Sequence, residues 1–306
     1  MADHPEGYGI YFQDRWNEAL AADPRFIYIN DWNEWTAGKY HPTDTGLSIA
    51  IPPEDDRRTV KFMRRDSNYM FVDQYNAEFN RCIQPMKDGY SDNYYMQMAQ
   101  NIRRYKGVRP IPKLSGMSPI VVDGDFADWD GVSVEYRDTL GDTLHRDFDG
   151  YRGLHYTDTS GRNDIVTCKV AVAGDDVCFY AETREPLTAP ADDKWMLLLI
   201  DADRDHSTGW YGYDLLVNRE RGKGTASVMG YDKGQWLMKR QVPMAWQGKC
   251  LELAVPLDLM KLDSGSFVFD FKWADNPGEL DDPIALCTEG DTAPNRRFNY
   301  RCIWAR

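Results

Sequence analysis

The sequence lacks several features that would place it in a simple functional class. No apolar run among the 306 residues approaches the length of a membrane-spanning helix, and no segment has the pattern of a secretory signal peptide. The six cysteines form no CxxC pair, which argues against a zinc or thioredoxin-type site. Basic residues are outnumbered, with a net charge of −13, so the basic footprint of a nucleic-acid-binding protein is missing.

The negative charge is concentrated in the second part of the chain. Residues 1–116 contain 15 basic and 16 acidic residues, and the rest contains 21 basic and 33 acidic residues, a net charge of −12. Such an asymmetry indicates two parts of different character. The acidic residues are interpreted either as a solvated surface or, in part, as calcium ligands.

The stretch 195–218 is the best-defined element of the sequence. Residues 195–200 are uninterruptedly apolar, a length typical of a strand covered on both faces. Three alternating aspartates and a Ser-Thr-Gly turn follow, and residues 210–218 return with aromatic and branched side chains. We therefore predict a central hairpin with an acidic connection.

From residue 119 onward the apolar pattern has a period of two. Further strands are predicted over residues 166–172, 177–183, 251–255, 267–273 and 298–303, separated by Gly- and Asp-rich turns. About eight to ten strands of this kind predict an all-β antiparallel sandwich over residues 119–306. Residues 137–163 form a long polar insertion within it.

Residues 1–110 follow a different pattern. A helical stripe of Phe12, Trp16 and Leu20 precedes short apolar runs at 26–29 and 69–72, and Tyr94, Met98, Ile102 and Tyr105 mark a second helix. This order predicts a partial α/β domain with parallel strands. A (β/α)₈ barrel needs eight strands, so only the end of one is expected. Residues 111–118 are Pro-rich and are predicted to be a linker.

The second part resembles the family 9 carbohydrate-binding modules and DOMON-type sandwiches. The resemblance rests on motifs in order along the chain: Asp123-Gly124 with Asp128-Trp129, Leu198-Leu199-Ile200-Asp201 with Gly212-Tyr213-Asp214, Leu251-Glu252-Leu253-Ala254-Val255-Pro256, and Ala274-Asp275-Asn276. It implies an oligo- or polysaccharide ligand. Sugar-binding members clamp the apolar face of the sugar between tryptophans. The tryptophan candidates are Trp195, Trp210, Trp236, Trp246 and Trp273, with Asp275 and Asn276 as polar partners; the alternative is that these tryptophans are core residues.

The aspartates of the hairpin connection are candidate metal ligands. Asp201, Asp203 and Asp205 alternate, and hard oxygen ligands two residues apart can converge on one calcium ion. The sixth position is His206 and the twelfth is Gly212, so this is not an EF-hand. A structural calcium ion and a plain polar turn both remain open.

The first part resembles the C-terminal end of the (β/α)-barrel glycoside hydrolases of family 99 and the WbsX-like group. The resemblance rests on Trp16, Asp23-Pro24 and Asn30-Asp31-Trp32-Asn33-Glu34-Trp35. It implies that Glu34 is a general acid or base, with Asp73 as a possible second carboxylate. In family 99 a second Glu stands three residues after the first, where this chain has Ala37.

Together these patterns predict a fragment of a larger carbohydrate-active protein. The parent is expected to be a glycoside hydrolase, while this chain lacks about six barrel strands and is expected to be inactive without the rest of the barrel. A periplasmic or extracellular location is expected from the resemblance. The alternative is an intact, non-enzymatic interaction or ligand-sensing module with a helical N-terminal cap.

Overall fold

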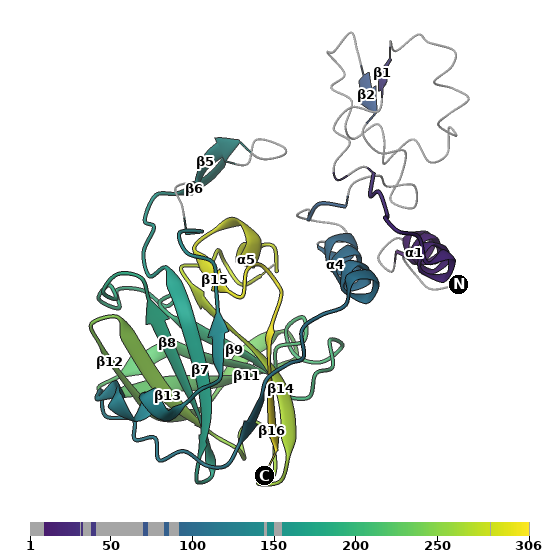
Figure 1. Ribbon diagram of the computed structural model, residues 1–306. Coiled ribbons are helices and arrows are strands. Elements are labelled where there is room, and N and C mark those ends of the chain that lie inside the picture. The colour runs from purple at the N-terminus through teal and green to yellow at the C-terminus, as the bar shows by residue number, and fades with distance from the viewer. Residues whose placement is uncertain are drawn as a thin grey trace. The chain divides into compact units, whose positions relative to one another are not determined.

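The computed structural model describes residues 9–30, 32, 38–40, 70–72, 83–85, 92–143, 146–149, 155–281 and 283–305. The chain divides into two units, Met1–Val108 and Arg109–Arg306 (Figure 1). None of the helices in the described residues of either unit is long and apolar enough to cross a membrane.

The first unit contains the two helices predicted from apolar stripes. They are α1 (Ile10–Ala22) and α4 (Asn93–Lys106). The rings of Phe12 on α1 and Tyr94 on α4 lie 5.8 Å apart. Asn101 of α4 is buried and donates to the Gln13 side chain at 2.9 Å. Both predicted helices are therefore confirmed, and their shared face is part apolar and part amide.

The strands predicted in the first unit are only partly correct. Residues 26–29 form no strand, and the side chains of Phe26 and Tyr28 are 71% and 75% exposed. The second run does form a strand, β2 (Met70–Val72), but it pairs antiparallel with β1 (Gly38–Tyr40). The apolar runs suggested parallel strands because composition does not reveal which neighbour a strand finds. The described residues therefore show no part of a barrel.

The second unit is built on one continuous sheet of 12 strands among the residues that the structure describes. All pairs are antiparallel except β3–β16. Along the sheet the strands run in this order: β3 (Lys113–Ser115), β16 (Tyr300–Ala305), β14 (Phe267–Asp275), β9 (Leu197–Asp201), β10 (Leu215–Gly222), β11 (Thr225–Asp232), β12 (Gln235–Gln247), β13 (Cys250–Pro256), β8 (Asp176–Thr183), β7 (Ile165–Ala173) and β4 (Glu135–Arg137); β15 (Asp291–Ala293) pairs with β14.

Strand β12 turns this sheet into a two-layer sandwich. Its residues 235–243 pair with β11, and its residues 244–247 pair with β13 in the other layer (Figure 1). The inward faces meet in one apolar core. Phe179 of β8 contacts Phe269 and Phe271 of β14, with ring centroids 5.8 and 5.6 Å apart. The predicted β-sandwich is thus confirmed.

The central hairpin is also present, with shifted bounds. Strands β9 and β10 pair antiparallel, Leu215 opposite Ile200. Strand β10 begins later than predicted because Trp210 and Tyr213 bond to each other through their backbones, at 2.8 and 3.0 Å. The predicted linker is not only a linker, since it contains β3. The polar insertion contains a separate hairpin of β5 (Arg146–Asp149) and β6 (His155–Asp158).

A buried carboxylate explains two of the sequence motifs. Glu252 of β13 has no exposed surface. Its Oε1 accepts hydrogen bonds from the backbone of Asp123 and Gly124, at 3.0 and 2.8 Å, and its Oε2 accepts from Trp129 Nε1 at 2.8 Å. Gly124 has φ +90°, which favours glycine.

These hydrogen bonds hold the 3₁₀ helix η3 (Phe126–Gly131) against the outer face of the β7–β8–β13 layer. The other outer face, formed by β9, β10, β11 and β14, is covered by Trp210, Tyr213 and the short helix α5 (Ala285–Thr288). Apolar side chains therefore pack on both faces of each layer.

We expect Glu252→Gln to destabilise the second unit by about 1–3 kcal/mol, because an amide donor would then face other donors in a buried site. Trp129→Phe keeps the ring and removes one of these donors. Urea unfolding of both single variants and of the double variant should show a coupling above about 0.5 kcal/mol. The exposed Glu185→Gln is the control; additive effects of the Glu252 and Trp129 changes would contradict the assignment.

Candidate functional site

A polar network closes one end of the sandwich, where β14 ends. Asp275 has no exposed surface and accepts three hydrogen bonds, from Arg162 Nε (2.8 Å), Asn163 Nδ2 (2.9 Å) and the Met196 backbone (2.9 Å). Burial raises the pKa of Asp275 to about 6, against the opposing effect of Arg162 and the hydrogen bonds. The network fixes the connection before β9 to the end of β14.

Arg162 extends the network toward the surface. Its side chain is 15% exposed and bridges Asp275 to Asp192, with Nη1 2.6 Å from Asp192 Oδ2. The hydrogen bond from Arg162 lowers the pKa of Asp192, whose side chain is 38% exposed. Asp192 also accepts from the Lys194 backbone, at 3.0 Å. The loop before β9 is therefore held in one arrangement by charge-assisted hydrogen bonds.

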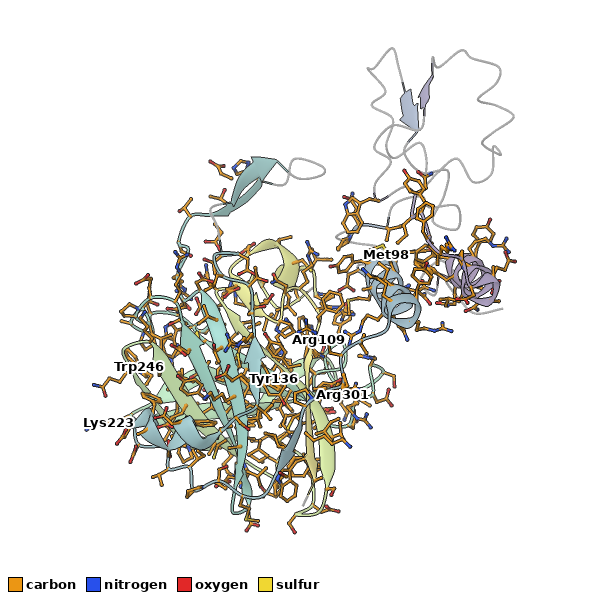
Figure 2. All side chains as sticks on the ribbon, viewed as in Figure 1. Met98, Arg109, Tyr136, Lys223, Trp246 and Arg301 are labelled. Carbon is orange, nitrogen blue, oxygen red and sulfur yellow. The ribbon has the colours of Figure 1, made fainter. Side chains whose placement is uncertain are left out.

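Two tryptophans and an arginine meet beside this loop. Trp195 is fully buried, and its Nε1 donates to the Thr188 carbonyl at 2.8 Å. Trp246 packs edge-on against it, with centroids 5.5 Å apart, and the Arg221 guanidinium lies 5.7 Å from the Trp195 centroid. Trp246 is 38% exposed, and Figure 2 shows it at the side of the sandwich away from Arg301.

The predicted sugar-binding tryptophans divide into three environments. Trp195 and Trp273 have no exposed surface, so neither can stack on a sugar in this structure. Trp210 is 4% exposed and packs with Trp236, at 6.4 Å, in the cluster that covers the outer face of β9 and β10. Only Trp246 of the five lies against Trp195 with a surface open to solvent.

The two predicted polar partners lie near Trp195. Asp275 bonds the Met196 backbone, as described, and the Asn276 backbone donates to the Lys194 carbonyl at 2.8 Å. The structure therefore brings Trp195, Asp275 and Asn276 together and adds Arg162, Asp192 and Arg221, which sequence patterns did not single out. Those three residues carry no motif signal, because their neighbours lie on other strands and loops.

Two of the three predicted metal ligands converge. Carboxylate oxygens of Asp201, Asp203 and Asp214 lie within 4.8 Å of one another. Asp201 is fully buried; its Oδ1 accepts from the Arg204 backbone at 2.6 Å, while its Oδ2 has no hydrogen-bond partner among the described residues. A Cβ at Gly212 would lie 3.5 Å from this Oδ2. Burial raises the pKa of Asp201 to about 7, and that of Asp214 also rises.

Asp205, the third predicted ligand, lies outside this group. Its exposed carboxylate accepts from the Ser207 backbone and hydroxyl, at 2.9 and 2.6 Å, and these bonds lower its pKa. Asp205 therefore closes a turn. The third carboxylate of the group comes from Asp214, just before β10, and not from Asp205 as predicted. The carboxylate oxygens of Asp201, Asp203 and Asp214, one of which is buried without a hydrogen-bond partner in the described residues, are of the kind that a hard cation such as calcium prefers.

A second acidic group lies at the edge of α5 and β15. Carboxylate oxygens of Asp138, Asp142 and Asp291 lie within 4.8 Å of one another, beside a cavity of about 260 Å³. The fully buried Lys272 of β14 donates to the Pro294 carbonyl. Burial raises the pKa of Asp138 to about 7, raises that of Asp291, and lowers that of Lys272 to about 7. No sequence pattern pointed to this cluster.

The predicted catalytic residues Glu34 and Asp73 lie outside the described residues, so their roles stay predictions. The strand expected before Glu34 is absent, since residues 26–29 form no strand. The geometry of the first unit therefore supplies no argument for glycoside hydrolysis.

Comparison with known proteins finds similar solved structures, two of which are described below. No protein-family model and no curated protein matches the chain. A family 9 carbohydrate-binding module from Caldicellulosiruptor kristjanssonii, in complex with cellotriose, aligns with a TM-score of 0.35 at 12% identity, over 64% of this chain and 94% of that chain. A Bacteroides uniformis protein named for carbohydrate binding aligns with a TM-score of 0.30 at 8% identity, over 63% and 98%. Both scores are low, so the fold rests on strand order and register.

The cluster of Asp138, Asp291 and Lys272 predicts a pH dependence of stability. The folded state holds a proton on Asp138 up to about pH 7, whereas the unfolded chain releases it near 3.8, so the free energy of unfolding falls as pH rises through this window. Lys272 has the opposite effect above about pH 7. Its amine has lost the proton in the folded state but keeps it in the unfolded chain up to about pH 10.5, so the free energy of unfolding rises with pH there.

In the Asp138→Asn variant, the free energy of unfolding should therefore fall less steeply between about pH 4 and pH 7, as measured by urea unfolding in EDTA. The exposed Asp130→Asn should retain the wild-type slope. An equal slope in Asp138→Asn and the wild type would exclude Asp138 as a source of the pH dependence.

Proposed function

We propose that Arg109–Arg306 is a carbohydrate-binding module whose ligand lies against Trp246 at the end of the sandwich. The observation that carries the proposal is a partly exposed indole supported by a buried one, beside a preorganised polar network. The apolar face of a sugar ring covers an indole well, and fixed polar groups can take its hydroxyls. The sequence resemblance to family 9 modules supports the same ligand class.

Rigidity favours Trp246 over the other tryptophans as the platform. Its ring is packed on Trp195, and Trp195 is held by the hydrogen bond to Thr188. The polar groups near Trp195, namely Arg162, Asp192 and Asp275, are already ordered by hydrogen bonds to one another, so binding would cost little additional side-chain entropy. A lone exposed tryptophan would not support this proposal; the fixed surroundings do.

Calorimetric titration of the full chain against neutral and acidic oligosaccharides tests the proposal. We expect Trp246→Ala to weaken binding about tenfold or more, because a stacked aromatic anchor is lost. Tyr211→Ala, which removes a 48% exposed aromatic elsewhere, is the matched control. Loss of affinity in Trp236→Phe with none in Trp246→Ala would move the site to the outer face. Binding to no glycan would favour the alternative of an interaction module.

We also propose that Asp201, Asp203 and Asp214 hold a structural calcium ion. The ion would neutralise three carboxylates that repel one another and would satisfy the orphaned Oδ2 of Asp201. Extracellular modules bind calcium with dissociation constants of about 0.1–1 mM, so this proposal goes with the expected location outside the cytoplasm.

We expect calcium to raise the melting temperature, since a ligand at a hundred times its dissociation constant adds about 2.7 kcal/mol. Asp203→Ala should abolish the rise, whereas Asp205→Ala, two residues away, should retain it. Melting in EDTA and in about 10 mM calcium, a hundred times a dissociation constant of about 0.1 mM, provides the measurement. Identical curves for the wild type would leave the aspartates as a polar turn.

A further inference from the structure

Arg221, whose guanidinium lies over the Trp195 ring, hydrogen-bonds to backbone carbonyl groups. Arg221 Nη1 donates to the Asn218 carbonyl at 2.7 Å, and its Nη2 donates to the Asp192 backbone carbonyl. Both acceptors are uncharged. A guanidinium has five N–H donors in a planar fork, so most of its hydrogen-bonding capacity remains.

The nearby carboxylates are committed to other arginines. Asp192 and Asp275 pair with Arg162, and Asp193 lies 3.3 Å from Arg219. In the described part of the chain, no carboxylate lies within ion-pair distance of Arg221. Partial burial lowers the pKa of Arg221, and the charges of Asp192, Asp193 and Asp275 only partly oppose this effect.

This arginine and the proposed sugar platform share one support. Both Arg221 and Trp246 contact Trp195, at 5.7 and 5.5 Å, so their separation cannot exceed the sum of these distances. A short oligosaccharide bridges such a span. A uronic acid residue combines the two required features, an apolar ring face for an indole and a planar carboxylate for a guanidinium fork.

From this arrangement we infer that the module binds a carboxylate-bearing, uronic-acid glycan, with the sugar on Trp246 and its carboxylate on Arg221. The inference rests on the proposed function and adds the chemical class of the ligand. The chain as a whole carries a net charge of −13, so nonspecific charge attraction would not hold a polyanion. A preference for an acidic glycan must therefore come from a local cation.

The test compares each acidic oligosaccharide with its own methyl ester. Oligomers of galacturonate, mannuronate and guluronate and glucuronoxylan fragments are titrated into the full chain in calcium-free buffer, free acid against ester. We expect at least one free acid to bind about tenfold more tightly than its ester, because esterification removes the charge-assisted bonds and keeps the ring.

Variants of the arginine assign the preference to Arg221. Arg221→Gln should abolish the acid-to-ester ratio while neutral binding persists, and Arg221→Lys, which keeps the charge without the fork, should leave an intermediate ratio. Arg219→Gln, two residues away and paired with Asp193, should keep the wild-type ratio. Melting curves show which variants remain folded, and Arg221→Lys provides the test if Arg221→Gln does not fold.

The remaining outcomes separate this inference from the proposed function. Binding of neutral glycans with no acid preferred over its ester overturns the inference and leaves the proposed function standing. Binding of no glycan overturns both. Equally tight binding of a sulfated glucan, which carries no carboxylate, overturns the carboxylate assignment, because the site would then be a general anion site.

Discussion

The carboxylate of Glu252 is the constraint on which the second unit depends. It lies in β13, in the middle of one layer, and it joins the segment before η3 to that layer through Asp123, Gly124 and Trp129. The oxygens of a buried carboxyl group need hydrogen-bond partners, and removing any one donor costs free energy because an oxygen then lacks its partner. This explains why the Asp-Gly and Trp of the opening motif occur with the Glu of a strand more than a hundred residues later.

Buried carboxylate oxygens of the sandwich differ in whether they have a hydrogen-bond partner in the described residues. Glu252 and Asp275 each accept three hydrogen bonds and serve as fixed joints of the structure. Asp201 keeps one buried oxygen without a partner in the described residues, and Asp138 does so as well. A buried carboxylate whose oxygens all accept hydrogen bonds can stay charged and stabilise the fold. One with an oxygen that lacks a partner is stabilised when it binds a proton or a cation.

Sequence patterns predicted the sandwich well because period-two alternation records which face of a strand is buried. In β7 the side chains of Cys168, Val170 and Val172 follow this alternation and lie in the core, whereas β8, β13 and β14 are buried over consecutive residues because both faces of their layer are covered. The run 26–29 failed because a strand also needs a partner, which composition does not name. Asp214 was passed over as a metal ligand in favour of Asp205 because spacing along the chain does not show how the hairpin folds back.

The same limit applies to Trp246, the proposed binding platform. Trp246 has the same parity along β12 as the buried Val242 and Met244, so alternation alone would place it in the core. Trp246 lies one residue before the end of β12, opposite the buried Leu251 of β13, and is nevertheless 38% exposed. The end of β10 also lies beside Trp195, where Arg221 lies over the Trp195 ring and donates to the Asp192 carbonyl of the loop before β9. Trp246 and Arg221 thus both contact Trp195, and it is the closed fold, not any local motif, that brings them to the same tryptophan.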